Sequence, residues 1–241
     1  MITAEAMKPL GLAIRDFYAG DVTAEILMHR DDGVVSHMSI SALFRGPLDF
    51  QVDKLLLELC SGSVLDVGAG AGIHSLYLQE KGIDVTALDV SPEACKVMQR
   101  RGVKKVICSS IAVFNGGPFD CLLLLGRSIG FVETIDGLAG FLTGVRRLVK
   151  PGGRILLNSL DVSKTDDPQN LSYHDANRKA GRYIGEIKLY MEYKGVTGPE
   201  LVLLHVDPVT LAAHAAAAGW KCRVLFQEKD GHYAAVLGKL D

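Results

Sequence analysis

The chain has 241 residues, of which 48% are hydrophobic and 22% are charged, and its formal net charge is -2 at pH 7. This composition is typical of a globular protein and excludes a disordered or fibrous chain. The near-neutral charge provides no basic surface of the kind that a phosphate backbone attracts, so it disfavours a nucleic-acid partner.

The five cysteines are widely spaced and form no C-x-x-C pair. This pattern indicates reduced thiols rather than a disulfide framework or a zinc site, and we expect no bound metal. The first residues include early acidic positions and lack a long apolar run, and no segment has the ~18 apolar residues of a membrane span. We therefore expect a cytoplasmic protein without a signal peptide or a membrane anchor.

Apolar residues at helical spacing predict two helices in the first 60 residues, around residues 10–18 and 52–59. Turn-forming residues stand between them, at residues 30–33. We expect residues 1–60 to form a helical N-terminal segment that acts as a lid.

From residue 61 onward, short β-branched runs alternate with helical patterns. The strands are predicted at residues 64–68, 84–90, 104–109, 119–126 and 154–160. The helices between them are predicted at residues 73–82, from Ser91 as the N-cap onward, and at 137–150. Strands that alternate with helices imply βαβ units and a parallel sheet.

The rest of the chain has a different pattern. Extended segments at 185–195 and 199–207 predict a hairpin, which lies in an insertion at about 160–206. After a helix at 208–218, the segments 220–229 and 232–240 predict a final hairpin. The expected fold class is α/β: a doubly wound, mostly parallel seven-stranded sheet over residues 61–241 that ends in a C-terminal antiparallel hairpin.

Three alternating glycines follow the first strand of this sheet, in the sequence VLDVGAGAG at residues 64–72. Glycines at a strand-to-helix bend permit positive φ and let backbone N–H groups approach a ligand closely. A dinucleotide-binding fingerprint would need a third glycine at position 73 or 75, where Ile73 and Ser75 stand, and no G-x-x-x-x-G-K-S/T motif occurs. A diphosphate ligand is therefore disfavoured.

The pattern D-x-G-x-G-x-G resembles motif I of the class I S-adenosylmethionine-dependent methyltransferases. Further similarity is found in FDCLLLLGRS (119–128) and VKPGGR (149–154). The resemblance implies that Asp66 lies near the methionine amino group and that Asp89, at the end of the next strand, binds the ribose hydroxyls. The other cofactor-binding residues that it implies are Gly68, Ala69, Gly70, Val90, Ser109, Ser110, Ile111, Leu125 and Gly126.

Candidates for acceptor binding come from three places in the chain. Arg127 and Ser128 directly follow the fourth strand, where the reaction centre of such a fold lies. Tyr18 in the N-terminal segment and His174 in the insertion are candidates because additions to this core usually cover the cofactor. No N-P-P-Y or D-P-P-Y follows the strand, which disfavours the amino-methylating nucleic-acid and glutamine enzymes.

No residue is assigned as catalytic, because displacement from a sulfonium depends mainly on positioning and a general base is optional. His74 is interpreted as a helix-face residue rather than a base, and His205, His214 and His232 are interpreted as structural.

The sequence thus favours an S-adenosylmethionine-dependent methyltransferase that acts on a small molecule, releases S-adenosylhomocysteine, and is a monomer or a homodimer. Two alternatives stay open: a methyltransferase acting on protein or nucleic acid, and a non-catalytic S-adenosylmethionine-binding protein.

Overall fold

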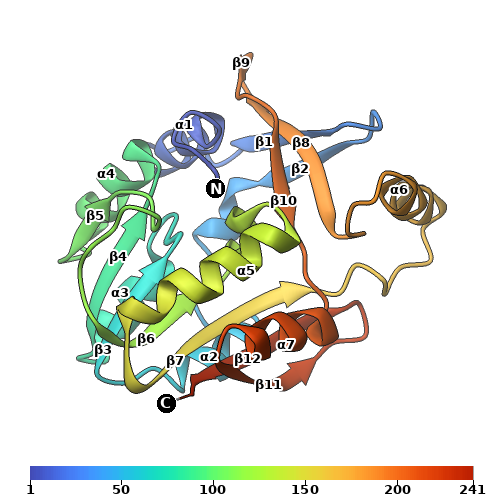
Figure 1. The fold of residues 1–241 in the computed structure, drawn as a ribbon. Coiled ribbons are helices and arrows are strands. Elements are labelled where there is room, and N and C mark those ends of the chain that lie inside the picture. The colour runs from blue at the N-terminus through green and yellow to red at the C-terminus, as the bar shows by residue number, and fades with distance from the viewer. Residues whose placement is uncertain (241) are drawn as a thin grey trace.

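The computed structural model describes residues 1–240, which form two sheets (Figure 1). The main sheet has seven strands in the order β11-β12-β7-β6-β3-β4-β5. Strands β3 to β7 pair in parallel, whereas β12 pairs antiparallel with both β7 and β11. The predicted fold class is therefore confirmed. The strands of the main sheet are β3 (Ser63–Val67), β4 (Asp84–Asp89), β5 (Val106–Cys108), β6 (Phe119–Leu124), β7 (Val149–Leu160), β11 (Trp220–Gln227) and β12 (His232–Lys239).

Helices cover both faces of the main sheet. Figure 1 shows α5 (Ile135–Gly144) and α7 (Pro208–Ala217) side by side on one face. The central strand β6 is buried on both sides: Leu122 and Leu124 pack with the α5 and α7 residues, while Cys121 and Leu123 pack with those of the opposite face. This explains why the strand reads as a continuous apolar run. The other helices of the main unit are α2 (Gln51–Leu57), α3 (Ile73–Glu80), α4 (Pro92–Arg101) and the short 3-10 turns η2 (Ser128–Val132) and η3 (Val145–Leu148).

The second sheet is antiparallel and joins two distant parts of the chain. Its order is β10-β8-β1-β2, and the short β9 pairs with β8. The insertion supplies β8 and β10, which confirms the predicted inserted hairpin. Its strands are β1 (Glu25–Arg30), β2 (Val35–Ser39), β8 (Glu186–Tyr193), β9 (Val196–Thr197) and β10 (Leu201–Leu204).

The prediction of a wholly helical N-terminal segment is wrong in its middle part. Helix α1 (Lys8–Tyr18) and α2 form as expected, and a 3-10 turn, η1 (Ile40–Leu43), lies between them, but residues 25–39 form the hairpin β1–β2. Neither strand alternates cleanly between buried and exposed residues, so the period-2 pattern of a strand is missing from the sequence. The hairpin is part of a larger sheet because β1 pairs with the distant strand β8. The turn residues at 30–33 connect the two strands.

Two further boundaries differ from the sequence predictions. Helix α5 ends at Gly144, and β7 begins at Val149 rather than at residue 154. Pro151-Gly152-Gly153 therefore lies inside β7, at a register shift opposite β6 rather than before the strand. The insertion also contains the helix α6 (Pro168–Lys179), which begins at the N-cap Asp167. Among residues 1–240, no helix combines the length and the apolar character that a membrane crossing needs.

Candidate functional site

One cavity of about 800 Å³ lies between the carboxyl ends of β3, β4 and β6 and the inner face of the second sheet. All the cofactor-binding residues expected from the sequence line its wall, apart from Asp66. The carboxyl ends of the parallel strands thus meet the second sheet across a shared space, which is the usual place for a ligand in a doubly wound fold.

The glycine loop forms one end of the cavity. Gly68, Gly70 and Gly72 all have positive φ, at 72°, 57° and 79°. A Cβ atom on Gly70 would meet no atom within 4 Å, whereas one on Gly72 would lie 2.9 Å from Met98 Cγ. Gly70 therefore leaves open space for a ligand, while Gly72 permits close packing of α3 against the helix that contains Met98.

Asp89 is held beside this loop. Its carboxylate accepts hydrogen bonds from the backbone N–H groups of Gly70 and Ser91, both at 2.8 Å. Burial raises the pKa of the Asp89 carboxyl, and the two N–H donors oppose that rise. Each carboxylate oxygen has a further lone pair, so Asp89 can still accept from the hydroxyl groups of a ligand.

Asp66 lies behind the loop rather than in the cavity wall. Its side chain is 2% exposed and accepts a hydrogen bond of 2.6 Å from Ser75 Oγ. Burial raises the pKa of Asp66, and the nearby His74 and Ser75 lower it. The sequence analysis placed this carboxylate at the methionine amino group, but in the structure it fastens β3 to α3.

A buried polar network at the base of the cavity was missed by the sequence analysis. Asp53 on α2 is 1% exposed and pairs with Arg45. It also lies 3.3 Å from His74 Nε2 and accepts a hydrogen bond of 3.1 Å from Asn158 Nδ2. His74, interpreted above as a helix-face residue, and Arg45 both line the cavity. The four residues come from separate segments, so no local motif marks them.

Arg127 and Ser128 line the cavity as predicted. Arg127 has a left-handed backbone (φ 60°), and its N–H donates to Asn158 Oδ1 at 2.8 Å. Ser128 Cβ lies only 3.0 Å from where a Cβ on Gly68 would stand. The two residues therefore sit against the glycine loop, at the boundary between the loop and the rest of the cavity.

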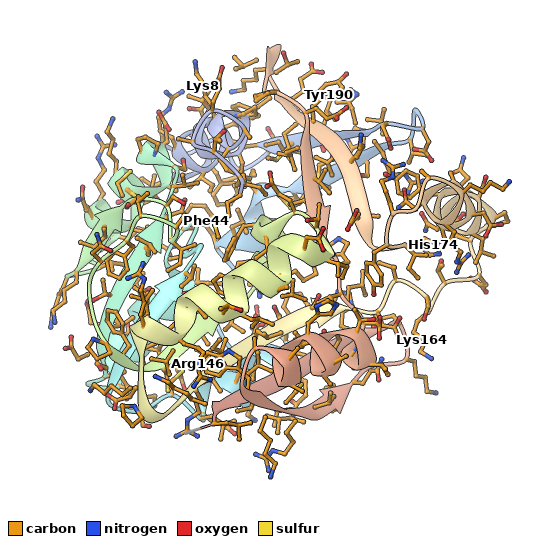
Figure 2. All side chains as sticks on the ribbon, in the orientation of Figure 1. Lys8, Phe44, Arg146, Lys164, His174 and Tyr190 are labelled. Carbon is orange, nitrogen blue, oxygen red and sulfur yellow. The ribbon has the colours of Figure 1, made fainter. Side chains whose placement is uncertain are left out.

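The insertion contributes a second wall, which includes His174. Arg30 on β1 donates a hydrogen bond of 2.8 Å to Asn170 on α6, and its guanidinium stacks over the Tyr173 ring. His174 is 4% exposed and lines the cavity next to Arg30. Burial lowers the pKa of His174, and the charges of Arg178 and Arg30 lower it further. Figure 2 shows His174 on α6 and Lys164 on the segment that leads to it, at one end of the molecule.

Tyr18 does not reach the cavity, so its assignment as an acceptor-binding residue is wrong. It lies in the last turn of α1, is 39% exposed, and its hydroxyl donates to the carbonyl oxygen of Arg100 on α4 at 3.4 Å. The cavity-facing side of α1 instead presents Leu10, Gly11 and Ile14. Helical spacing predicts which residues of α1 share a face, but it does not predict which face lines the cavity.

His205 and His232 were interpreted as structural, yet both line the cavity. His205 follows β10, and its Nδ1 atom is buried without a hydrogen-bond partner among residues 1–240. Burial, and then the charges of Arg127 and His232, lower the pKa of His205 to about 3, so its imidazole is neutral. Glu228, Asp230 and His232 bring three potential metal-ligand atoms within 4.8 Å of one another. Nothing in the sequence spacing marked His205, because η2 and β10 meet only in the fold.

Comparison with known proteins identifies the family. A model described as a methyltransferase domain matches residues 65–157. The crystal structure of a SAM-dependent methyltransferase from Bacteroides fragilis, in complex with S-adenosyl-L-homocysteine, is 30% identical and covers 100% of this chain and 98% of that one, with a TM-score of 0.86. The chain belongs to the S-adenosylmethionine-dependent methyltransferases. The resemblance read from the glycine motif is confirmed, and so is the cofactor that it implied.

The curated relatives match less than half of this methyltransferase. A ubiquinone biosynthesis O-methyltransferase from Xanthomonas oryzae pv. oryzae (strain PXO99A) is 29% identical over 113 residues, which are 44% of this chain and 46% of that protein. A demethylmenaquinone methyltransferase from Tropheryma whipplei is 28% identical over 109 residues, or 43% of this chain and 44% of that protein. The chain thus spans less than half the length of these relatives.

The residues present fit S-adenosylmethionine. The open space over Gly70 lets a ligand lie along the loop. Asp89, at the end of the neighbouring strand β4, presents a carboxylate beside the loop. Arg45 and His74 add donors for a carboxylate at the loop end of the cavity. No lysine stands in the loop, so the site lacks the cation that binds a polyphosphate.

Proposed function

We propose that the protein transfers a methyl group from S-adenosylmethionine to a small-molecule acceptor bound between the glycine loop and the second sheet. The observation that carries this proposal is a cavity whose wall includes both the loop and the inner face of that sheet. A volume of about 800 Å³ lies in the range of small-molecule sites.

The cover over the cavity supports a small acceptor rather than a macromolecule. The N-terminal segment, the second sheet and α6 all contribute residues to the wall. In this proposal, residues 1–60 and the insertion at about 160–206 together form the cover. The curated relatives, which are named for ubiquinone and menaquinone methylation, also support an acceptor of the small-molecule class.

The bound cofactor supplies an activated methyl group on sulfur, and the chain supplies position. Gly68 to Gly70 and Asp89, which line the cavity, would hold the nucleoside, and Ser110 and Ile111 would lie at its adenine end. The apolar residues of the second sheet exclude water, and the acceptor is fixed by the polar groups around Arg127. Fixing two reactants in this way raises their effective concentration, which is a large part of the rate enhancement in a displacement reaction.

The first experiment is calorimetric titration with S-adenosylhomocysteine, S-adenosylmethionine and NAD. We expect binding of the two sulfur nucleosides and none of NAD. Asp89→Ala is expected to weaken binding at least about tenfold, since a buried carboxylate that bonds two hydroxyls contributes ~1.5–3 kcal/mol. Asp84→Ala is the matched control, because Asp84 begins the same strand but is exposed and pairs with Lys105 at the surface.

Acceptors are then screened by S-adenosylhomocysteine release. Small phenols, quinols, amines and carboxylates form one set, and protein and nucleic-acid substrates form the other. Turnover with a small molecule supports the proposal. Turnover only with a macromolecule, or binding of NAD in place of the sulfur nucleosides, refutes it.

A further inference from the structure

Arg127 is an exposed cation in the cavity wall and has no partner among the described residues. Within residues 1–240 its guanidinium makes no hydrogen bond and no ion pair, although its backbone is fixed by Asn158. A guanidinium with no protein partner keeps all its N–H donors available for an anion of a ligand. Because the residue lines the cavity, an anionic group of a bound ligand can reach the guanidinium.

Two neutral groups beside Arg127 also lack partners. The Ser128 hydroxyl and His205 Nδ1 are buried and make no hydrogen bond within the part of the chain that the structure describes. Both residues line the same cavity, and Arg127 is close enough to lower the pKa of His205. A hydroxyl, a neutral imidazole and a guanidinium make a site for one negative charge, since only one of the three groups carries a positive charge.

The acidic residues of the cavity wall have partners elsewhere. Asp161 accepts from Ser163, Asp167 caps α6, and Asp230 pairs with His232. Asp89 accepts from the glycine loop. None of these carboxylates pairs with Arg127, so the protein itself leaves this charge uncompensated.

The opposite wall is apolar and rich in methionine. Alternate residues of β8, namely Ile187, Leu189 and Met191, face the cavity together with Met28 of β1 and Met38 of β2. With Met1 and Met7, five of the six methionines in the chain line this one cavity. Methionine side chains are flexible and polarisable, and they adapt to flat or irregular apolar ligands and make favourable contacts with aromatic rings.

We propose that the acceptor is an amphipathic carboxylate, whose apolar body packs on the methionine-lined face of the second sheet and whose carboxylate pairs with Arg127. The planar guanidinium fork suits a carboxylate, which it can bind through two parallel hydrogen bonds. A phosphate carries more negative charge than the single positive charge of this site can compensate. This inference rests on the proposed function, because it describes the acceptor of that reaction.

The test compares probes that differ only in charge. A panel of apolar carboxylates and their primary amides, beginning with 4-phenylbenzoate and 4-phenylbenzamide, is titrated into the protein saturated with S-adenosylhomocysteine. We expect carboxylates of this panel to bind at least about tenfold more tightly than their amides, because a hydrogen bond between two charged groups is stronger than one to a neutral amide.

Three variants test which side chain causes the preference for carboxylates over amides. Arg127→Gln is expected to abolish the preference for the carboxylate while it changes the affinity for S-adenosylhomocysteine less than about twofold. Met38→Ser, on the edge strand β2, is expected to weaken carboxylate and amide by the same factor, because it removes apolar contact and no charge. Arg223→Gln is the matched control, since Arg223 is exposed on β11 and does not line the cavity.

Two results overturn the inference. One is the absence of any preference for carboxylates over amides across the panel. The other is a loss of S-adenosylhomocysteine affinity in Arg127→Gln, which would assign the guanidinium to the methionine carboxylate of the cofactor. A protein that binds no S-adenosylhomocysteine at all would instead refute the proposed function, so the two failures are distinguishable.

Discussion

Exchanging Gly70 and Gly72 for alanine, one at a time, separates the two roles that the structure gives to the glycine loop. Both residues have positive φ, at 57° and 79°. An alanine in that conformation costs about 1–2 kcal/mol of folding free energy at either position. The difference lies in the space around the new methyl group. At Gly70 it meets no atom within 4 Å, and at Gly72 it lies 2.9 Å from Met98 Cγ and 3.1 Å from Val103 Cγ2.

The expected stabilities follow from this geometry. Gly70→Ala is expected to lose only the backbone cost, which corresponds to a Tm lower by about 2–8 °C in a chain of this size. Gly72→Ala adds overpacking of the buried Met98, at roughly 1–3 kcal/mol more. Thermal unfolding without ligand therefore places Gly72→Ala below Gly70→Ala.

The order reverses for ligand binding. S-adenosylhomocysteine at about 100 times its Kd stabilises the native protein by ~2.7 kcal/mol. A methyl group on Gly70 occupies the space along which the cofactor is proposed to lie, so we expect Gly70→Ala to lose at least tenfold in affinity, about 1.4 kcal/mol. Gly72→Ala is expected to keep the native affinity, because its methyl group points into the protein.

The assay is Tm as a function of S-adenosylhomocysteine concentration for the native protein and both variants, with Kd from calorimetry. Native affinity in Gly70→Ala would refute the reasoning, because the open space at Gly70 would then not be the cofactor's. An affinity loss confined to Gly72→Ala would do so as well, and would indicate that the loop binds through its helix-facing side.

Three other predictions concern residues around the cavity. Asp53→Ala leaves the Arg45 guanidinium without its buried carboxylate and is expected to cost about 3–5 kcal/mol, measured by urea unfolding; a loss below 1 kcal/mol would contradict the network. Tyr183→Phe removes a hydroxyl that donates to Asp207 Oδ2 at 2.6 Å and accepts from the Asp207 N–H at 2.9 Å, so about 1–2 kcal/mol is expected to be lost in the same assay. The His205 Cε1 proton is expected to show no titration by NMR from pH 8 to pH 5, because its pKa is about 3 in the folded state. The unfolded imidazole binds a proton near pH 6.5, so the contribution of His205 to the free energy of unfolding is fully present above that pH and falls by about 2 kcal/mol at pH 5. If the free energy of unfolding of His205→Gln fell by the same amount between these pH values, the assignment would be contradicted.

The succession of strands and helices along the chain in the main unit follows from the sequence alone. Its strands read as β-branched or fully apolar runs, and Ser91 caps α4 as predicted, with its hydroxyl accepting from the Ala94 N–H. Local chemistry also identifies the glycine loop and the carboxylate at the end of β4. These features are decided within a few residues of chain, so a single sequence is enough to place them.

The second sheet and most of the acceptor side of the cavity are decided only by tertiary structure. The hairpin β1–β2 becomes half of a sheet because β8, more than 150 residues later, pairs with β1 along residues 27–30. His205 and Arg127 meet for the same reason, since η2 packs beside the end of β10, where Gly130 approaches Leu204.

Asp66 and Tyr18 illustrate the opposite case, in which the side chain does not point where the sequence analysis expected it. Ser75 draws the carboxylate of Asp66 behind the loop, and the packing of α1 on α4 turns Tyr18 away from the cavity. A sequence specifies which residues a strand or helix contains and, through its periodicity, which of them share a face. Which face meets the ligand depends on contacts between segments that are far apart in the chain, and those contacts have no local pattern.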